Sequence, residues 1–172
     1  MLAILCIRCD GGRQVSRVKR PALRGSILGA VLSAWNPAMR ALLRSPLHWP
    51  LSRWFAVLSW TGRKSGRRFS TPVSYVREGS TAWLTTGDRW WHNLTGGAPV
   101  AIRIRGRSYE GHGLAVTDRV ESRLEHDRLF RQHAWFRWLA GIPRGPHGGP
   151  DPDALDRALA AGRVLVRIDL KP

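Results

Sequence analysis

Residues 58–94 read LSWTGRKSGRRFSTPVSYVREGSTAWLTTGDRWWHNL, and this stretch decides the fold. Three short runs in and beside it have the composition of β-strands. They are Phe55–Trp60, Phe69–Arg77 and Thr81–Thr86. The polar turn Thr61–Gly66 separates the first two, and Glu78–Ser80 forms a hairpin turn between the second and the third. Arg89–Leu94 follows Gly87-Asp88 and predicts one or two helical turns.

The chain after residue 94 continues the strand pattern and adds helices. Asp118 is a plausible helix N-cap, with Glu121 completing a capping box. The helix that follows carries apolar residues at helical spacing, namely Val120, Leu124, Phe130, Ala134, Trp135, Trp138 and Leu139. The other predicted elements are strands at Val100–Arg105, Ser108–Val116 and Arg163–Leu170 and a short helix at Ala154–Ala161.

The N-terminal part differs in pattern. An apolar stripe over residues 22–35 and an Asn36-Pro37 start predict two helices that end near Arg44. We expect an α+β fold, an antiparallel split barrel of about six strands with N-terminal helices and a helix before the last strand. Residues 1–20 are expected to be a poorly ordered extension, and 21–172 a single domain.

Positive charge is concentrated in the first half of the chain. The net charge is +16, and residues 1–77 hold 14 Lys or Arg against a single acid, Asp10. Such a field attracts polyanions, among them nucleic acid, anionic lipid and phosphorylated cofactors. Arginine outnumbers lysine strongly, which is also typical of a GC-rich genome. Charge alone therefore leaves the class of partner open.

The turn Thr61–Gly66 and the two arginines after it have the chemistry of an anion site. The segment holds four cations, two glycines and two hydroxyl groups between strands. Glycines let backbone amides face an anion, and Arg and Lys supply charge-assisted hydrogen bonds to phosphate or carboxylate. The order of residues is not that of a Walker loop. From the residues alone, anion binding and an ordinary solvated turn both remain open.

At this point the sequence resembles the deazaflavin-dependent nitroreductase family of split barrels. The marks of the family are a Thr-Gly-Arg-Lys-Ser-Gly turn, a Thr-Pro followed by a Tyr, and a Trp-x-His-Asn-Leu helix start. They occur here, in that order, as Thr61–Gly66, Thr71-Pro72 with Tyr75, and Trp90–Leu94. The resemblance covers about residues 42–117 and resumes at the final strand.

The resemblance implies a cofactor and a reaction. Family members bind coenzyme F420, a deazaflavin with a phosphodiester and an oligoglutamate tail, and pass hydride from its reduced form to nitroaromatics, quinones or other unsaturated acceptors. By resemblance, Arg63, Lys64 and Ser65 hold the phosphate and tail. The other cofactor-binding residues that it implies are Phe69, Ser70, Thr71, Thr85, Thr86, Gly87, Trp90, Trp91 and Asn93. This activity would make the chain an F420-dependent reductase with a small-molecule acceptor.

The sequence also departs from the family pattern. Asp88 follows Gly87 where a serine-lysine pair is common, which puts a carboxylate near an anionic ligand. The tyrosines that cover the substrate side in some relatives are replaced by Trp135, Phe136 and Trp138. Hydride transfer is the chemistry of the cofactor, so a catalytic side chain need be no more than a hydrogen-bond donor to the acceptor. Ser74 and Tyr75 are the candidates for that donor.

Two alternatives stay open. The first is an FMN-binding reductase of the same fold, and the second is a non-enzymatic basic domain that binds a membrane surface or nucleic acid. Nucleic acid is not expected, because neither a recognised motif nor aromatic residues interleaved with the basic patch are evident. No metal site is expected, since Cys6 and Cys9 form one pair where zinc needs four ligands. We expect a cytoplasmic monomer or homodimer, with peripheral membrane contact through the N-terminal helices left open.

Overall fold

The computed structural model describes residues 52–171, and the predicted N-terminal extension, N-terminal helices and cysteine pair lie outside them. All the strands and helical segments predicted after residue 52 are confirmed, most within one or two residues. The strands are β1 Phe55–Thr61, β2 Arg68–Glu78, β3 Thr81–Thr86, β4 Ala98–Ile104, β5 Arg107–Val116 and β6 Val164–Leu170. The helical segments are the 3-10 helix η2 Arg89–Leu94 and the helices α2 Arg119–Gln132, α3 Ala134–Leu139 and α4 Pro152–Ala160.

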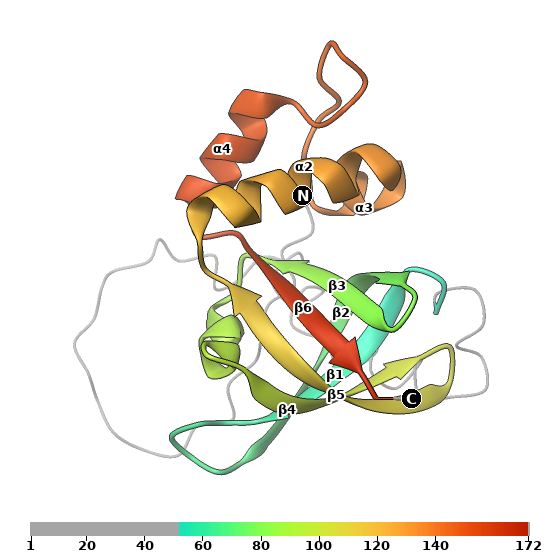
Figure 1. The fold of residues 1–172 in the computed structure, drawn as a ribbon, viewed down its shortest axis with the longest axis vertical. Helices are drawn as coiled ribbons and strands as arrows, with labels where there is room; N and C mark the ends of the chain where they lie inside the picture. Colours follow the sequence, from blue (N-terminus) through green and yellow to red (C-terminus); the bar gives the residue numbers. More distant parts are fainter. Residues whose placement is uncertain (1–51, 172) are drawn as a thin grey trace, which may run out of the picture.

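The six strands form a closed antiparallel barrel in the order β1-β2-β3-β6-β5-β4 (Figure 1). Strand β6 is inserted between β3 and β5, so that Thr81 pairs with Asp169. The predicted α+β antiparallel barrel is therefore confirmed.

The pairing between β2 and β3 is incomplete. β2 pairs with β1 from Arg68 to Ser74, but with β3 only from Tyr75 to Glu78. Thr85 and Thr86, at the end of β3, pair with β6 on the other edge of the strand but with no residue of β2. The two strands therefore diverge along the first half of β2, and we call this opening the seam.

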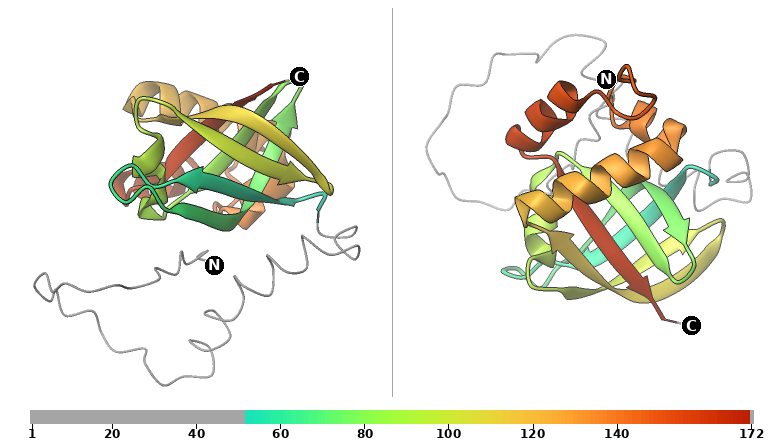
Figure 2. Two further views of the ribbon diagram at one scale, coloured as in Figure 1. Left: turned by 90° about the horizontal axis from the view of Figure 1, so that it is seen from below. Right: turned by 45° about the horizontal axis from the view of Figure 1, so that its top comes forward.

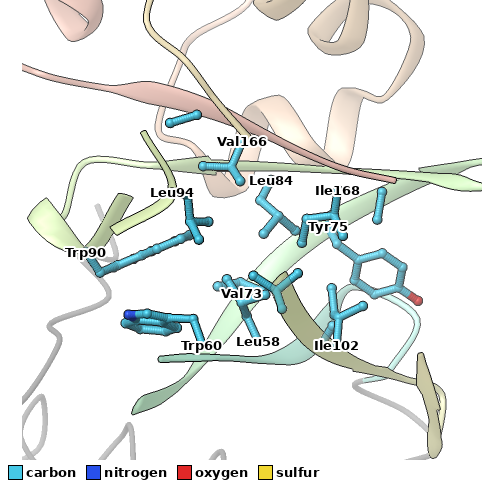
Figure 3. Close-up of a cluster of buried hydrophobic side chains, with 14 of the residues drawn as sticks. Leu58, Trp60, Val73, Tyr75, Leu84, Trp90, Leu94, Ile102, Val166 and Ile168 are labelled. Carbon is cyan, nitrogen blue, oxygen red and sulfur yellow. The ribbon is translucent and has the colours of Figure 1, made fainter. Parts of the chain in front are cut away.

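Alternate residues of the strands point inward and fill the barrel. The interior cluster includes Leu58, Leu84, Ile102, Val166 and Ile168, each fully buried. Figure 3 shows Trp60 and Trp90 on one side of this cluster and the Tyr75 hydroxyl on the opposite side. We call the first side, which carries the Thr61–Gly66 turn and η2, the loop end (Figure 2). The opposite side is called the arginine end.

The helices α2, α3 and α4 lie together against one side of the barrel (Figures 1 and 2). A second apolar cluster lies between them and the outward-facing residues of the strands, with Phe130 and Phe136 at its centre. As predicted, the Asp118 side chain caps α2, accepting a hydrogen bond from the Glu121 backbone N–H at 2.8 Å.

The predicted apolar stripe of the long helix is corrected in two ways. The helix is interrupted at His133, which separates α2 from α3. Val120 and Leu124 were expected in the core and are 69% and 61% exposed. The face that α2 buries instead carries Ser122, His126, Leu129 and Phe130. The polar members of that face satisfy each other with hydrogen bonds, so hydrophobic periodicity could not reveal them.

Candidate functional site

The Thr61–Gly66 turn is closed by its own backbone. The Gly62 N–H donates to the Arg67 carbonyl at 2.8 Å, and the Gly66 N–H donates to the Gly62 carbonyl at 2.9 Å. Gly66 has φ +64°, a conformation that glycine adopts without strain. A Cβ atom on Gly62 would lie 2.6 Å from the Phe69 ring and 2.8 Å from the Ser65 hydroxyl oxygen. The turn is thus compact, and its shape depends on glycine at position 62.

Arg63 and Asn93 join this turn to η2. The Asn93 side-chain oxygen accepts a hydrogen bond from the Arg63 backbone N–H at 3.2 Å, while its amide group donates to the Trp90 carbonyl at 2.9 Å. The Arg63 guanidinium donates to the carbonyls of Thr95 at 3.2 Å and His92 at 3.5 Å. Part of the charge predicted for phosphate binding is therefore directed at the end of η2. The side chains of Lys64 and Arg67 extend from the exposed face of the turn.

An aromatic cluster lines the barrel beneath the turn. The ring of Trp60 is stacked on Phe69 with centroids 5.9 Å apart and lies 5.2 Å from the ring of Trp90. Trp60 and Trp90 are buried, whereas Phe69 and Trp91 are only partly buried. The Trp60 indole N–H is buried and meets no hydrogen-bond acceptor among the described residues. The loop end therefore combines flat apolar surfaces with an unsatisfied donor.

The seam begins directly beside this cluster. Phe69, Ser70 and Thr71, all predicted to bind the cofactor, lie on the part of β2 that pairs with β1 and not with β3. A strand edge outside a ladder presents backbone donors and acceptors to whatever lies next to it. The predicted residues Thr85, Thr86 and Gly87 follow the other side of the opening, at the end of β3.

Thr85 faces away from the barrel interior, toward α2. Its hydroxyl oxygen lies 3.0 Å from Nε2 of His126, whose Nδ1 lies 2.7 Å from the Ser122 carbonyl. A carbonyl only accepts, so Nδ1 carries the proton, and the Thr85 hydroxyl donates to Nε2. Burial lowers the pKa of His126 to about 4, and this histidine is therefore neutral at pH 7. The Thr85 hydroxyl proton is therefore engaged in the hydrogen bond to His126. The role of Thr85 toward a cofactor remains a prediction.

Thr86 and Asp88 form a tight bend at the end of β3. The Asp88 backbone N–H donates to the Thr86 hydroxyl oxygen at 3.0 Å. Burial raises the pKa of the Asp88 carboxyl to about 6. Gly87 between them is exposed, and a Cβ atom there would meet nothing within 4 Å. The carboxylate noted in the sequence thus stands beside the opening of the seam, and its charge depends on pH near neutrality.

The two predicted donors to the acceptor, Ser74 and Tyr75, point to opposite sides of β2. Both are buried. The Tyr75 ring belongs to the barrel interior, and its hydroxyl donates to the Ser52 carbonyl at 2.9 Å. Ser74 lies where β2 and β3 begin to diverge. The structure therefore separates the two candidates, and only Ser74 adjoins the seam.

The aromatic residues of α3 have different environments. Phe136 is fully buried in the second apolar cluster, and Trp135 packs against that cluster while remaining partly exposed. Trp138 is 71% exposed. As a group they do not form a continuous wall over the seam.

Sequence reasoning missed the His126 link and a cluster of arginines at the arginine end. The sequence assigns no role to His126, and its spacing of four residues from Ser122 is the signal that could have identified a buried polar face. Within residues 52–171, no group of three or more metal-ligating side chains is placed to hold an ion. In the same part of the chain, no helix has both the length and the hydropathy required to span a membrane.

Comparisons with known proteins complete the description of the site. A model of the F420H(2)-dependent quinone reductase family matches residues 48–134. Among solved structures, the chain is similar to an F420 reductase at 16% identity and a TM-score of 0.41, covering 77% of this chain and 93% of that chain. It is also similar to an FMN-binding, pyridoxamine 5'-phosphate oxidase-related protein from Nostoc punctiforme at 12% identity and a TM-score of 0.43, with coverages of 89% and 82%. A third is an FAD-binding protein from Mesorhizobium loti, at 14% identity, a TM-score of 0.42 and coverages of 79% and 89%. No curated protein matches the chain.

Proposed function

The chain belongs to the F420H(2)-dependent quinone reductase family, and from that premise we propose that it reduces a quinone, or a similar small unsaturated acceptor such as a nitroaromatic, with reduced coenzyme F420. The family is one of oxidoreductases, and F420 is its cofactor. The proposal adds the class of acceptor and the residues that bind the cofactor and the acceptor.

The observation that carries the proposal is the seam between β2 and β3. A deazaflavin has a flat tricyclic ring whose edge carries hydrogen-bonding groups, and it needs apolar walls and backbone partners. The first half of β2 supplies a strand edge outside the β3 ladder, and the half-buried Phe69 and Trp91 supply apolar surface beside it. We therefore assign the ring to the seam, with Phe69, Ser70 and Thr71 along one side and Thr86 and Gly87 at the other.

The cationic turn at the same end supports the placement of the anionic part. The phosphodiester and glutamate tail require several positive charges in an exposed position. Lys64, Arg67 and Arg68 have exposed side chains on or next to the turn. Arg63 instead fixes the turn to η2 through the Thr95 and His92 carbonyls. We assign binding of the phosphate and tail chiefly to Lys64, Ser65 and Arg67, with Arg63 as the residue that positions them.

The roles of the protein in the reaction follow from these positions. When bound, the reduced cofactor supplies the hydride. The protein orients the ring in the seam, and the turn fixes the anionic tail, so that the hydride donor is held in position for transfer. Ser74 is the residue we assign as hydrogen-bond donor to the acceptor, because it lies where the seam closes.

A fluorescence titration with oxidised F420 tests the cofactor site. We expect micromolar binding to the full chain, weakened about tenfold in Lys64→Ala/Arg67→Ala because two charge-assisted hydrogen bonds are lost. The matched control is Arg157→Ala/Lys171→Ala, which removes the same charge from exposed positions elsewhere and should bind as the wild type. FMN is titrated in parallel, and tighter binding of FMN than of F420 would contradict the assignment.

A second assay tests the acceptor. Reduced F420 and menadione are mixed with the wild type and with Ser74→Ala, and oxidation of the cofactor is followed. Loss of rate in Ser74→Ala with unchanged F420 affinity supports its role as donor. Equal rates in the two proteins would remove Ser74 from the mechanism.

A further inference from the structure

A second pocket lies at the arginine end, at the far end of β2 from the cationic turn. It has a volume of about 470 Å³, which is in the range of small-molecule sites. Three arginines from separate parts of the chain line it: Arg53 precedes β1, Arg77 lies near the end of β2, and Arg105 lies in the turn between β4 and β5. From Phe69 to Arg77 β2 extends over about 26 Å, so this pocket is separate from the cationic turn.

The charged side chains that line the pocket are basic. Its lining includes His133 in addition to the three arginines, and no carboxylate of residues 52–171 contributes to it. Glu78, which follows Arg77 in the sequence, lies 3.7 Å from His133 and is held by Arg128, whose Nη1 and Nη2 both donate to it at 3.0 Å. Glu78 is therefore paired with Arg128 and does not line the pocket.

Two of the arginines, Arg77 and Arg105, influence the hydroxyl group of Tyr75. Burial raises the pKa of the Tyr75 hydroxyl, and the neighbouring guanidinium groups of Arg105 and Arg77 oppose that rise. Arg77 is oriented by its Nε, which donates to the Gly79 carbonyl at 2.9 Å, and it lies 4.8 Å from the centre of the Tyr109 ring. Apolar surface from Trp135 and the buried Ile104 completes the lining.

The backbone at Arg105 supports a function for its side chain. Arg105 and Gly106 form the two-residue turn between β4 and β5, with φ of 48° and 80°. Such a turn favours Asn or Asp followed by Gly, because the left-handed conformation is unfavourable for a long side chain. Arg105 is the only non-glycine residue with positive φ between residues 52 and 171. An arginine is thus kept at a position where the backbone prefers other residues.

We propose that the arginine-end pocket binds a small organic anion with a flat apolar body, of the aryl carboxylate class. Guanidinium forks match the geometry of a carboxylate, and the aromatic and aliphatic walls match a ring. This inference does not depend on the proposed function, because it concerns binding without F420.

Calorimetric titration of the full chain with 2-naphthoate, in the absence of F420, tests the proposal. We expect binding that weakens about tenfold in Arg77→Ala/Arg105→Ala, with Arg144→Ala/Arg157→Ala as the control of equal charge, which should bind as the wild type. 2-Naphthamide, which has the same ring system without the charge, should bind at least about tenfold more weakly than 2-naphthoate.

Three outcomes would overturn the proposal. Equal affinity for the amide would show that the arginines do not recognise charge. Inorganic phosphate binding as tightly as 2-naphthoate would show that the apolar walls contribute nothing. Undiminished binding by Arg77→Ala/Arg105→Ala, whose folding is checked by circular dichroism, would place the ligand elsewhere. None of these results would affect the F420 titration, so the two proposals fail independently.

Discussion

The two ends of the barrel use arginine in different ways. At the loop end, Arg63 donates to the carbonyls of Thr95 and His92 and so holds the turn against η2. At the arginine end, Arg53, Arg77 and Arg105 surround an open pocket, and Arg105 is held in an unfavourable backbone conformation. Arg63 thus fastens one segment to another, whereas Arg77 is held within its own hairpin by the Gly79 carbonyl and lines a pocket with Arg53 and Arg105. The placement of the arginines, and not their charge, distinguishes the two ends.

The largest expected effect is a loss of stability in acid. Burial lowers the pKa of His126 to about 4 from a normal 6.5, so the unfolded chain binds the proton more tightly. The neutral His126 therefore contributes about 3 kcal/mol to the free energy of unfolding. This contribution is complete above pH 6.5 and is lost as the pH falls toward 4. His126→Gln should remove this loss, as measured by urea denaturation at pH 7 and pH 4.5.

Asp88 at the loop end changes stability with pH in the direction opposite to His126, and a variant of Asp88 separates the two effects. Its pKa is raised from 3.8 to about 6, so the folded state binds the proton more tightly and stability falls as the pH rises through 6. Asp88→Asn should therefore make the acid loss due to His126 steeper. A profile unchanged by Asp88→Asn would contradict the effect of partial burial on this carboxyl.

The second prediction concerns a substitution that disturbs the Thr61–Gly66 turn at the loop end and leaves the arginine end unchanged. Gly62→Ala places a Cβ atom 2.6 Å from the Phe69 ring and 2.8 Å from the Ser65 hydroxyl oxygen. We expect a stability loss of about 1–3 kcal/mol from overpacking, together with weaker F420 binding. Gly87→Ala is the control for stability alone, since its Cβ would enter open space, and its F420 affinity is not compared because Gly87 is itself assigned to the cofactor site. Thermal unfolding and the fluorescence titration measure the two effects in Gly62→Ala, and equal melting temperatures of Gly62→Ala and Gly87→Ala would show that the turn adapts freely.

The third prediction sharpens the contrast between the arginines. Arg63→Ala removes hydrogen bonds to two backbone carbonyls and should cost about 1 kcal/mol of stability. Lys64→Ala should lower F420 affinity without lowering the melting temperature. If Arg63→Ala lowers affinity and leaves the melting temperature unchanged, Arg63 binds the cofactor directly.

The smallest expected effect is a gain in stability. Arg105→Asn places a residue suited to the left-handed conformation in the β4–β5 turn and should stabilise the barrel by up to about 1 kcal/mol. The same variant should bind 2-naphthoate more weakly. A variant that is both more stable and equally able to bind would show that Arg105 has no role in the pocket.

Much of the barrel could be predicted because each strand is encoded locally. Alternation and turn residues located β1 to β3 and η2 within a residue or so, and the capped start of α2 was also predicted correctly. The long helix was less well predicted because its buried face includes Ser122 and His126. Its apolar Val120 and Leu124 point to solvent, so the apolar stripe indicated the wrong face.

The sites depend on contacts that local patterns do not contain. The turn Thr61–Gly66 was predicted as an anion site, but the use of Arg63 by η2 depends on a residue pair 32 positions apart. The seam exists because the ladder between β2 and β3 ends at the pair Tyr75 and Leu84, which no local signal near β3 indicates. The arginine-end pocket gathers residues from four distant segments, and the sequence shows them only as scattered cations.

The position of β6 has a consequence for how the protein is made. β3 pairs with β6 across more than eighty residues, from Thr81 to Asp169, and β5 pairs with the other side of the same strand. While the chain is being synthesised, β1 to β5 are therefore complete before either of these edges has its partner. Such long-range pairing folds slowly and leaves strand edges open to other chains. During translation, closure of the barrel must wait for Val164–Leu170 to leave the ribosome.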